Sequence, residues 1–336
     1  DTIDLSSDTT GLKMPKGTTA QRPAAVDSTV GETRQNTTTG KMEIYTGAKG
    51  WRALQQTGQD VGVVPSNNFN TVLYTGTSAA RSINVGFQPG LTWIKDRTTN
   101  YSHVWIDAQR GATYQLKSNS TDAQSQESQG LTAFTSTGFN LGTATGSYNL
   151  NNDNYVSWNW KASVPFSYPA SGSGEGSQIP SAGYSNQAAG FSIVEYTGVF
   201  DSGTGAGSRQ VKHNLGGIPE IIIAKEINRT STRWVVRTQI IDNDPYSYLV
   251  LNGTNALAQL GTIDGTLNLP TDEKFDINWN TSVGTSGQDI IAYCFRSIPG
   301  YSLIGKYTGT GSATDSPKIY TGFEPAWLMT KDTSDA

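Results

Sequence analysis

The sequence predicts an all-β protein, and three observations lead to this fold class. Charged residues make up only 15% of the 336 residues and aromatic residues 10%, a balance that excludes a disordered chain. The chain is rich in Thr, Gly, Ser and Asn, which favour strands and turns over helices. Turn-forming clusters between residues 86 and 154 recur about every 8–12 residues, as is typical of a β-sandwich.

Residues 1–58 form a region of their own at the N-terminus. The cluster Asn36–Gly40 predicts a turn, and apolar and polar residues alternate over Met42–Tyr45, so we expect a short hairpin that ends at Trp51. A segment this small cannot bury enough surface to be stable alone. We therefore expect it to need the rest of the chain or identical copies of itself.

The remainder of the chain contains a repeat. Tyr-Thr-Gly occurs at residues 74–76, 196–198 and 307–309. Each Tyr-Thr-Gly is followed by a second shared block. The block begins with Gly and has Pro three residues later. An apolar run then leads to a Lys six residues after the Pro, and an acidic residue follows the Lys. The aligned residues are Pro89, Pro219 and Pro325, followed by the pairs Lys95–Asp96, Lys225–Glu226 and Lys331–Asp332. We expect these Lys–acid pairs at the surface, where a strand leaves the core.

The ends of the first two copies also match. Residues 154–161 parallel residues 289–296, so that Trp158 and Trp160 correspond to Tyr293 and Phe295. The predicted organisation is an anchor region at 1–58, a linker at 59–65, β-sandwich repeats at 66–162 and 190–298, a Gly/Ser/Pro-rich linker at 163–189, and the start of a third repeat at 299–336. A long hairpin within one domain is the alternative for 163–189. Because the third copy stops after its Lys–acid pair, we expect the polypeptide to continue.

The strands follow from the period of the apolar residues. In residues 155–161, Val156, Trp158 and Trp160 share one face, which predicts a sheet with one face on a core. Residues 91–94 and 221–224 are apolar throughout and predict buried strands. Core packing is favoured over a sugar-stacking platform for these tryptophans. The predicted repeat core is Trp93, Trp158, Trp160, Tyr293 and Phe295.

Few residues are suited to catalysis or metal binding. The single cysteine, Cys294, excludes an intrachain disulfide. His103 shares a strand face with Asp107 but no nucleophile is indicated, and His213 lies at a turn where we expect exposure. The acid and Asn clusters at 151–154 and 242–244 match no Ca²⁺-loop spacing. We predict no catalytic residue, no metal site and no cofactor.

Two further observations limit the partners. The net charge of −4 and the isoelectric point near 5.3 argue against a nucleic-acid surface. No apolar stretch is long enough to span a membrane. We therefore expect neither nucleic-acid binding nor membrane insertion.

Residues 14–54 contain Pro-Lys-Gly-Thr-Thr-Ala-Gln-Arg-Pro and then Gly-x-x-Arg-x-Asn-Thr-Thr-Thr-Gly-x-x-Glu-x-Tyr. This pattern resembles segments of bacteriophage tail fibre and other virion fibre proteins. The resemblance implies a homotrimer in the virion, docked through its N-terminus to other phage tail or neck proteins. The oligomer or anchor residues that it implies are Pro15, Arg22, Pro23, Arg34, Asn36, Tyr45 and Trp51.

Residues 93–162 contain Trp-Ile-Lys-x-Arg, Arg-Gly-Ala, Ser-Asn-Ser-Thr-Asp-Ala and Tyr-Val-x-Trp-Asn-Trp-Lys-Ala. They are similar to a domain repeated in fibre proteins of marine and cyanobacterial phages, which is described as a SPRY-like or concanavalin-like β-sandwich. The second copy departs from it, with residues 248–258 in place of two of these blocks.

The two resemblances together imply a non-enzymatic tail fibre that attaches to a host-surface glycan or lipopolysaccharide. Loop tyrosines are the candidate receptor contacts: Tyr101, Tyr114 and Tyr246. Two alternatives stay open. One is a glycan-degrading enzyme whose catalytic part lies outside this segment; within the segment the available acid pairs are Asp107–Glu127 and Asp272–Glu273. The other is a purely structural neck or collar fibre.

Overall fold

The computed structural model describes residues 15–24, 27–38, 41–47, 50–53, 63–200, 207–260, 266–278, 283–312 and 314–334. The all-β class is confirmed, because these residues form strands and two short 3-10 turns, Thr19–Gln21 and Pro65–Asn67, but no α-helix. No helix within these ranges could span a membrane. The chain divides into two compact units, residues 1–60 and residues 61–336.

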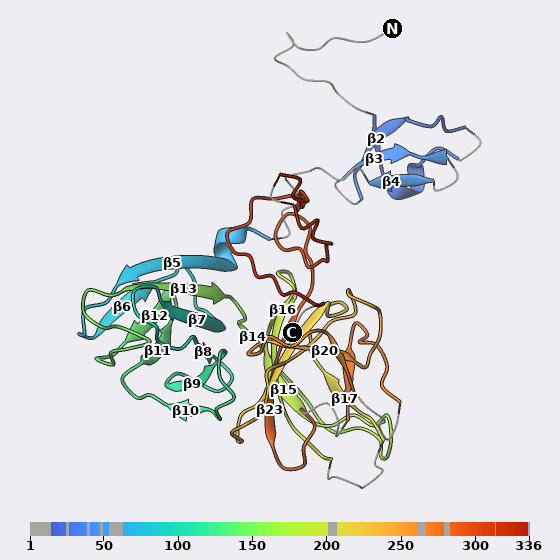
Figure 1. Cartoon of the computed structure of the whole chain (residues 1–336). Helices are drawn as coiled ribbons and strands as arrows, with labels where there is room; N and C mark the ends of the chain where they lie inside the picture. The colour runs from blue at the N-terminus through green and yellow to red at the C-terminus, as the bar shows by residue number, and fades with distance from the viewer. Residues whose placement is uncertain are drawn as a thin grey trace. The chain divides into compact units, whose positions relative to one another are not determined.

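The first unit is one small sheet in the order β1-β2-β3-β4, of which Figure 1 labels β2, β3 and β4. Its strands are β1 (Lys16–Gly17), β2 (Thr33–Asn36), β3 (Lys41–Tyr45) and β4 (Trp51–Ala53). The predicted hairpin is present, with β2 antiparallel to β3 and Thr33 opposite Ile44. Part of the predicted linker at 59–65 lies outside the described residues.

The first repeat is a sandwich of a six-stranded and a three-stranded sheet. The larger sheet has the order β10-β9-β8-β7-β13-β5 and the smaller one β11-β12-β6. Buried side chains of both sheets, among them Tyr74, Ile83, Phe139 and Tyr155, form the core between them. The strands are β5 (Phe69–Thr75), β6 (Arg81–Asn84), β7 (Leu91–Asp96), β8 (Val104–Asp107), β9 (Tyr114–Lys117), β10 (Ser125–Gln126), β11 (Leu131–Thr135), β12 (Gly138–Leu141) and β13 (Asn154–Trp160).

The second repeat has the same strand order. Its larger sheet runs β14-β15-β16-β23-β18-β19-β20-β21, in which β16 to β21 correspond to β5-β13-β7-β8-β9-β10, and its smaller sheet is β17-β22. Both predicted apolar strands, β7 and β18, are therefore equivalent and buried. The strands are β14 (Val164–Tyr168), β15 (Ser181–Asn186), β16 (Phe191–Thr197), β17 (Arg209–Lys212), β18 (Ile221–Glu226), β19 (Val235–Arg237), β20 (Ser247–Val250), β21 (Ala258–Gln259), β22 (Lys274–Ile277) and β23 (Asp289–Phe295).

Residues 163–189, expected as a linker, contribute strands β14 and β15 to the larger sheet of the second repeat. Val164 lies opposite Ser185, and Ala182 opposite Glu195 of β16. The Gly/Ser/Pro composition that suggested a linker is concentrated between the two strands, where the chain turns. The expectation of a linker is thus wrong for this segment, which extends a sheet and covers the edge of β16.

The middle strand of the first repeat, β13, is covered on both faces. Tyr155 is fully buried in the sandwich core, and Trp160 packs on the opposite face against the second repeat. The prediction of a single covered face is therefore wrong. The alternation was identified correctly, but each of its two faces has an apolar partner.

The Tyr-Thr-Gly repeat has one packing role in both complete copies. The Tyr74 hydroxyl donates to the carbonyl of Tyr148 at 2.8 Å, and the Tyr196 hydroxyl donates to that of Val283 at 2.9 Å. A Cβ atom on Gly76 would lie 2.1 Å from the Leu150 carbonyl oxygen. The equivalent Cβ atom on Gly198 would lie 2.1 Å from the carbonyl oxygen of Thr285. The glycine is required because the segment before the middle strand crosses directly over it.

In the complete copies Asp96, Lys225 and Glu226 are buried, contrary to expectation, whereas Lys95 is half-buried. Asp96 is 1% exposed and accepts hydrogen bonds from the backbone N–H groups of Thr98 and Thr99. Lys225 is fully buried, and its ammonium donates to the Glu226 carbonyl at 2.9 Å. Burial lowers the pKa of Lys225 to about 8. Asp96 thus closes the turn that follows its strand, whereas Glu226 forms an ion pair of 3.5 Å with Arg229.

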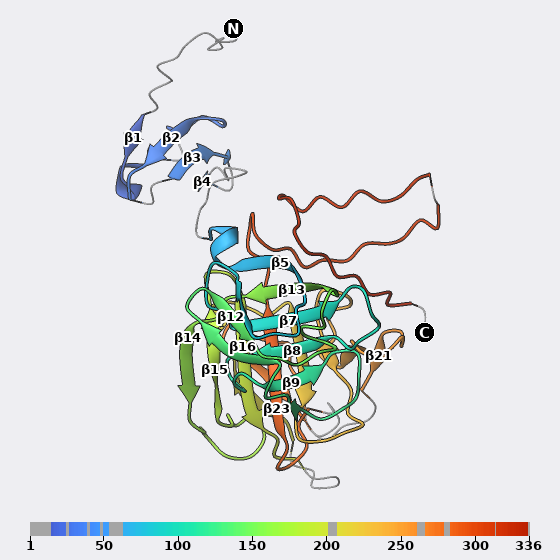
Figure 2. The same cartoon turned by 90° about the vertical axis from the view of Figure 1, so that its left-hand side faces the viewer.

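Residues 299–334 follow β23 without a strand of their own in the described part. Figure 2 shows this segment as loops without arrows. Trp327 nevertheless packs against the cluster between the two repeats.

Candidate functional site: an aromatic groove beside the inter-repeat interface

The two repeats pack against each other through equivalent sheet faces. Trp105 of the first repeat lies 4.8 Å from Tyr293 and 5.1 Å from Trp234 of the second, measured between ring centroids. The indole nitrogen of Trp234 donates to the Lys117 carbonyl at 3.0 Å. The two repeats thus share one continuous apolar cluster within residues 61–336.

A buried polar contact crosses the same interface. The Tyr293 hydroxyl donates to Asp107 at 2.7 Å, and Asp107 forms an ion pair with Arg110 at 2.6 Å. Nearby, Gln109 donates to Glu195 at 2.6 Å, while burial raises the pKa of the Glu195 carboxyl. Asp107 is fully enclosed in this contact, so it holds the repeats together and is not available as a catalytic acid.

An open groove of about 380 Å³ lies at the edge of this interface. It is lined by Trp93, His103, Trp158 and residues 326–329. The Trp93 ring stands 5.2 Å from Trp158 and 6.1 Å from Trp327, in edge-to-face arrangements. Sites for small molecules typically have this size and combine aromatic walls with a few polar groups.

The polar group of the groove is His103. Its Nδ1 atom accepts a hydrogen bond of 3.2 Å from the indole N–H of Trp93, so the neutral ring carries its proton on Nε2. Burial, together with the charge of Lys95, lowers the pKa of His103. No hydrogen bond joins Nε2 to another described residue, which leaves one N–H donor for a ligand. The groove therefore offers ring faces and a neutral donor.

The tyrosines expected to contact a receptor do not gather at the groove. Tyr101 and Tyr114 are exposed by 38% and 37%. Tyr246 is only half-exposed, and its hydroxyl accepts from the Leu267 N–H at 3.3 Å. The predicted repeat-core residues, in contrast, lie together at the interface: Trp93, Trp158, Trp160, Tyr293 and Phe295.

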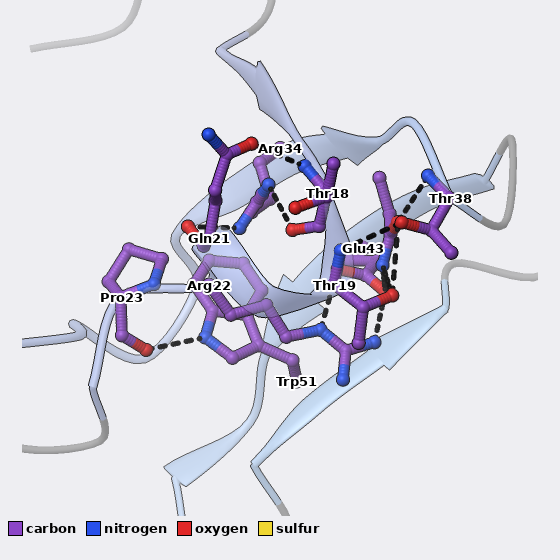
Figure 3. A network of polar contacts seen from close by, with 10 residues as sticks. Thr18, Thr19, Gln21, Arg22, Pro23, Arg34, Thr38, Glu43 and Trp51 are labelled. Atoms are coloured by element: carbon purple, nitrogen blue, oxygen red, sulfur yellow. Dashed lines mark hydrogen bonds and ion pairs between the residues drawn. The ribbon is translucent and has the colours of Figure 1, made fainter.

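Several of the implied anchor residues, among them Arg22, Arg34 and Trp51, belong to a network of polar contacts within the first unit (Figure 3). Arg22 donates to Glu43 at 3.1 Å, and Arg34 donates to the carbonyls of Gln21 and Thr18 at 2.9 and 3.1 Å. Glu43 is 2% exposed, and the hydrogen bond from Arg22 lowers its pKa.

The other implied anchor residues share in this interior or lie beside it. Asn36 donates to Glu43 at 2.7 Å, and the Trp51 indole donates to the carbonyl of Pro23 at 3.3 Å. Tyr45 lies 5.6 Å from Trp51, whereas Pro15 is exposed. Most of the motif is thus needed to fold the unit itself.

The second histidine is buried, contrary to expectation. His213 is fully enclosed, its Nδ1 atom accepts from the Leu215 N–H, and Nε2 lies 3.1 Å from the Thr271 carbonyl. Burial lowers its pKa to about 4. Among the described residues no group of His, Cys, Asp or Glu is placed to hold a metal ion.

Sequence reasoning missed the groove for an identifiable reason. The sequence predicts Trp93 and Trp158 as core residues, and they lie at the border of the cluster between the repeats. The period of two places His103 on one strand face with Trp105 and Asp107, but its ring accepts a hydrogen bond from Trp93. The third copy contains a signal for the groove. Trp327 and Met329 align with Leu91 and Trp93 of the first copy, which face the interface, so apolar side chains were to be expected at these positions too.

Comparison with known proteins gives one family. The family described as "Domain of unknown function (DUF7483)" matches residues 64–336. No curated protein and no solved structure matches the chain.

Proposed function

Because the chain belongs to the DUF7483 family, whose description assigns no activity, we propose its function from the site: it is a virion fibre subunit that binds a host-surface saccharide in the aromatic groove. The observation that carries this proposal is the groove itself. Trp93, Trp158 and Trp327 line an open space together with His103, whose Nε2 atom has no hydrogen-bond partner among the described residues.

This arrangement suits a sugar ring. The C–H face of a pyranose is apolar and packs on an indole ring, while its hydroxyl groups need donors and acceptors at the rim. A neutral histidine can serve such hydroxyls without favouring a charged ligand. We therefore assign a neutral saccharide to the groove.

The first unit serves as the virion anchor in this proposal, with homotrimerisation presenting several grooves together. The support is the resemblance of residues 14–54 to phage fibre segments. A trimer would raise the avidity for a repetitive cell-surface glycan without a strong individual site.

Retention of the full chain on host cells or on immobilised lipopolysaccharide tests the proposal. Leu328 lines the groove and is 77% exposed, so Leu328→Asp should keep the fold and reduce retention. Val164 on the edge strand β14 is 58% exposed and outside the groove, so Val164→Asp is the matched control. Equal retention of both variants would contradict the groove assignment, and release of reducing sugars would assign an enzyme instead.

A further inference from the structure

Two neighbouring residues of the second repeat carry a chemistry that the groove does not use. Asn252 and Gly253 form the single Asn-Gly pair of the sequence. They lie in the turn that follows β20, and the exposed residues Thr254 and Asn255 come next. The side-chain amide of an asparagine can react with the backbone nitrogen of the following residue, because the two groups close a five-membered ring.

The Asn252 side chain continues the pairing of two strands. Val235 of β19 lies opposite Val250 of β20, and the Leu251 N–H donates to the Trp234 carbonyl at 3.0 Å. At the next step the Trp234 N–H donates to Oδ1 of Asn252 at 2.9 Å. A side-chain oxygen thus takes the place of a backbone carbonyl, and the strand fixes its position.

The same hydrogen bond prepares the side-chain amide for attack. When a nucleophile adds to the amide carbon, negative charge develops on Oδ1. A backbone N–H that already points at this oxygen stabilises the charge as it forms. Because Trp234 is fully buried and packed in the cluster between the repeats, we expect this donor to keep its position during the reaction.

The backbone nitrogen of Gly253 is only weakly hydrogen-bonded. It lies 3.4 Å from the Val250 carbonyl oxygen, which is longer than the usual distance of about 2.9–3.0 Å. Glycine has no Cβ atom, so no side chain shields the nitrogen, and the backbone is free to rotate into the geometry of attack. The nucleophile and the amide carbon that it attacks are therefore neighbours in the chain.

We propose that Asn252 is a site of non-enzymatic deamidation in the folded protein. The Gly253 nitrogen loses its proton to hydroxide and forms a bond to Cγ of Asn252. The bond from Cγ to Nδ2 breaks, and the leaving group takes a proton from water and departs as ammonia, which leaves a succinimide. Water then adds to one of the two ring carbonyl carbons, and the ring opens to aspartate or to isoaspartate. No oxidation is involved, and water is the co-reactant.

The two products differ in their effect on the interface between the repeats. Aspartate keeps an oxygen in the place of Oδ1, so the bond from the Trp234 N–H is retained. Isoaspartate routes the backbone through the former side chain, which lengthens the chain by one carbon and removes the acceptor. The Trp234 ring packs on Trp105 and Tyr293. Conversion to isoaspartate should therefore loosen the contact between the repeats with time.

The test incubates the folded full chain at pH 7 and at pH 9 and measures both products by peptide mass spectrometry. Asn255 is exposed and is followed by alanine, so it is the matched internal control. Asn252 should convert at least about tenfold faster than Asn255, because Trp234 stabilises the developing charge. Conversion should be faster at pH 9, since the attacking nitrogen must lose its proton. Equal rates at the two asparagines would overturn the proposal.

Two variants separate this chemistry from a general effect on the fold. Gly253 does not have a positive φ, and a Cβ atom there would first meet the end of the flexible Asn255 side chain, at 2.7 Å. Gly253→Ala should therefore fold, and Asn252 should convert more slowly in it. Hydrogen exchange of the Trp234 amide should accelerate in the aged chain and stay slow in Asn252→Asp, which represents the aspartate product. Undiminished conversion in Gly253→Ala, or an unchanged Trp234 amide in a chain rich in isoaspartate, would contradict the assignment.

Discussion

The hydroxyl of Tyr293 donates a 2.7 Å hydrogen bond to Asp107, a residue 186 positions earlier in the chain. Both groups are fully buried, and they belong to different repeats. The contact crosses an apolar interface and makes the stability of one repeat depend on the other.

Tyr293→Phe is therefore expected to destabilise both repeats together. The variant removes one buried hydrogen bond, which costs on the order of 1–3 kcal/mol. Because Asp107 keeps Arg110 as a partner, we expect the loss of unfolding free energy to lie at the lower end of this range. Chemical denaturation measures the change. Tyr196→Phe, which breaks a bond within one repeat, is the control, and unchanged stability of Tyr293→Phe would mean that the repeats fold independently.

Alanine at the three repeated glycines should have unequal effects. Gly76→Ala and Gly198→Ala place a methyl group on a backbone carbonyl that cannot move cheaply, and should cost at least about 1–3 kcal/mol. Gly309→Ala should leave the midpoint of thermal unfolding unchanged. Equal destabilisation at all three positions would show that Gly309 is packed in solution.

Acid should destabilise the chain through His213. Its pKa is about 4 in the folded chain and about 6.5 when unfolded. Between these values the unfolded state binds the extra proton, so stability falls as the pH drops from 6.5 to 4, by on the order of 3 kcal/mol in total. The slope of unfolding free energy against pH measures this effect. His213→Asn should flatten the slope in this window, whereas an unchanged slope would rule out His213 as its source.

Saccharide binding should be independent of pH above the ordinary pKa of histidine and decline in more acidic solution. Burial keeps His103 neutral, and protonation would put a second proton on Nδ1, against the indole N–H of Trp93. Titration calorimetry across pH 5–8 tests this expectation. His103→Asn retains an acceptor and a donor but does not titrate, so its binding should stay constant with pH. A parallel decline in that variant would assign the pH effect to another group.

Glu43→Gln is expected to destabilise the first unit selectively. The substitution removes the charged partner of Arg22, whose side chain is 32% exposed while that of Glu43 is 2% exposed, so the loss should be on the order of 1–3 kcal/mol, the cost of a hydrogen bond to a charged group. Because Arg22 lowers the pKa of Glu43, the same contribution should be lost in the wild type as the pH falls below 4.3. Amide exchange in β2 and β3 measures the effect. Val30→Ala, at a site 70% exposed, is the control and should change nothing.

Much of the fold could be predicted from particular residues. The period of two around Trp158 and Trp160 identified the middle strand, and the three aligned prolines identified equivalent strands. Composition alone misled at residues 163–189, because Gly, Ser and Pro indicate a turn without telling whether strands flank it. Burial of β13 on both faces could not be predicted. The alternation of Tyr155 with Val156 shows that the strand has two faces, but it does not show what packs against each of them.

The candidate site was harder to predict because it depends on contacts between distant segments. His103 gains its role from Trp93 and from residues 326–329, which lie more than two hundred positions away in the chain. The buried Lys225 and His213 show the same limit. The sequence shows that these residues are polar, but it does not show that tertiary packing buries them.

Six of the eight tryptophans belong to the cluster between the repeats or pack against it: Trp93, Trp105, Trp158, Trp160, Trp234 and Trp327. Their rings lie close enough for their excited states to couple. We therefore expect these rings to dominate the near-ultraviolet circular dichroism of the protein, which would make the spectrum a reporter of whether the two repeats remain joined.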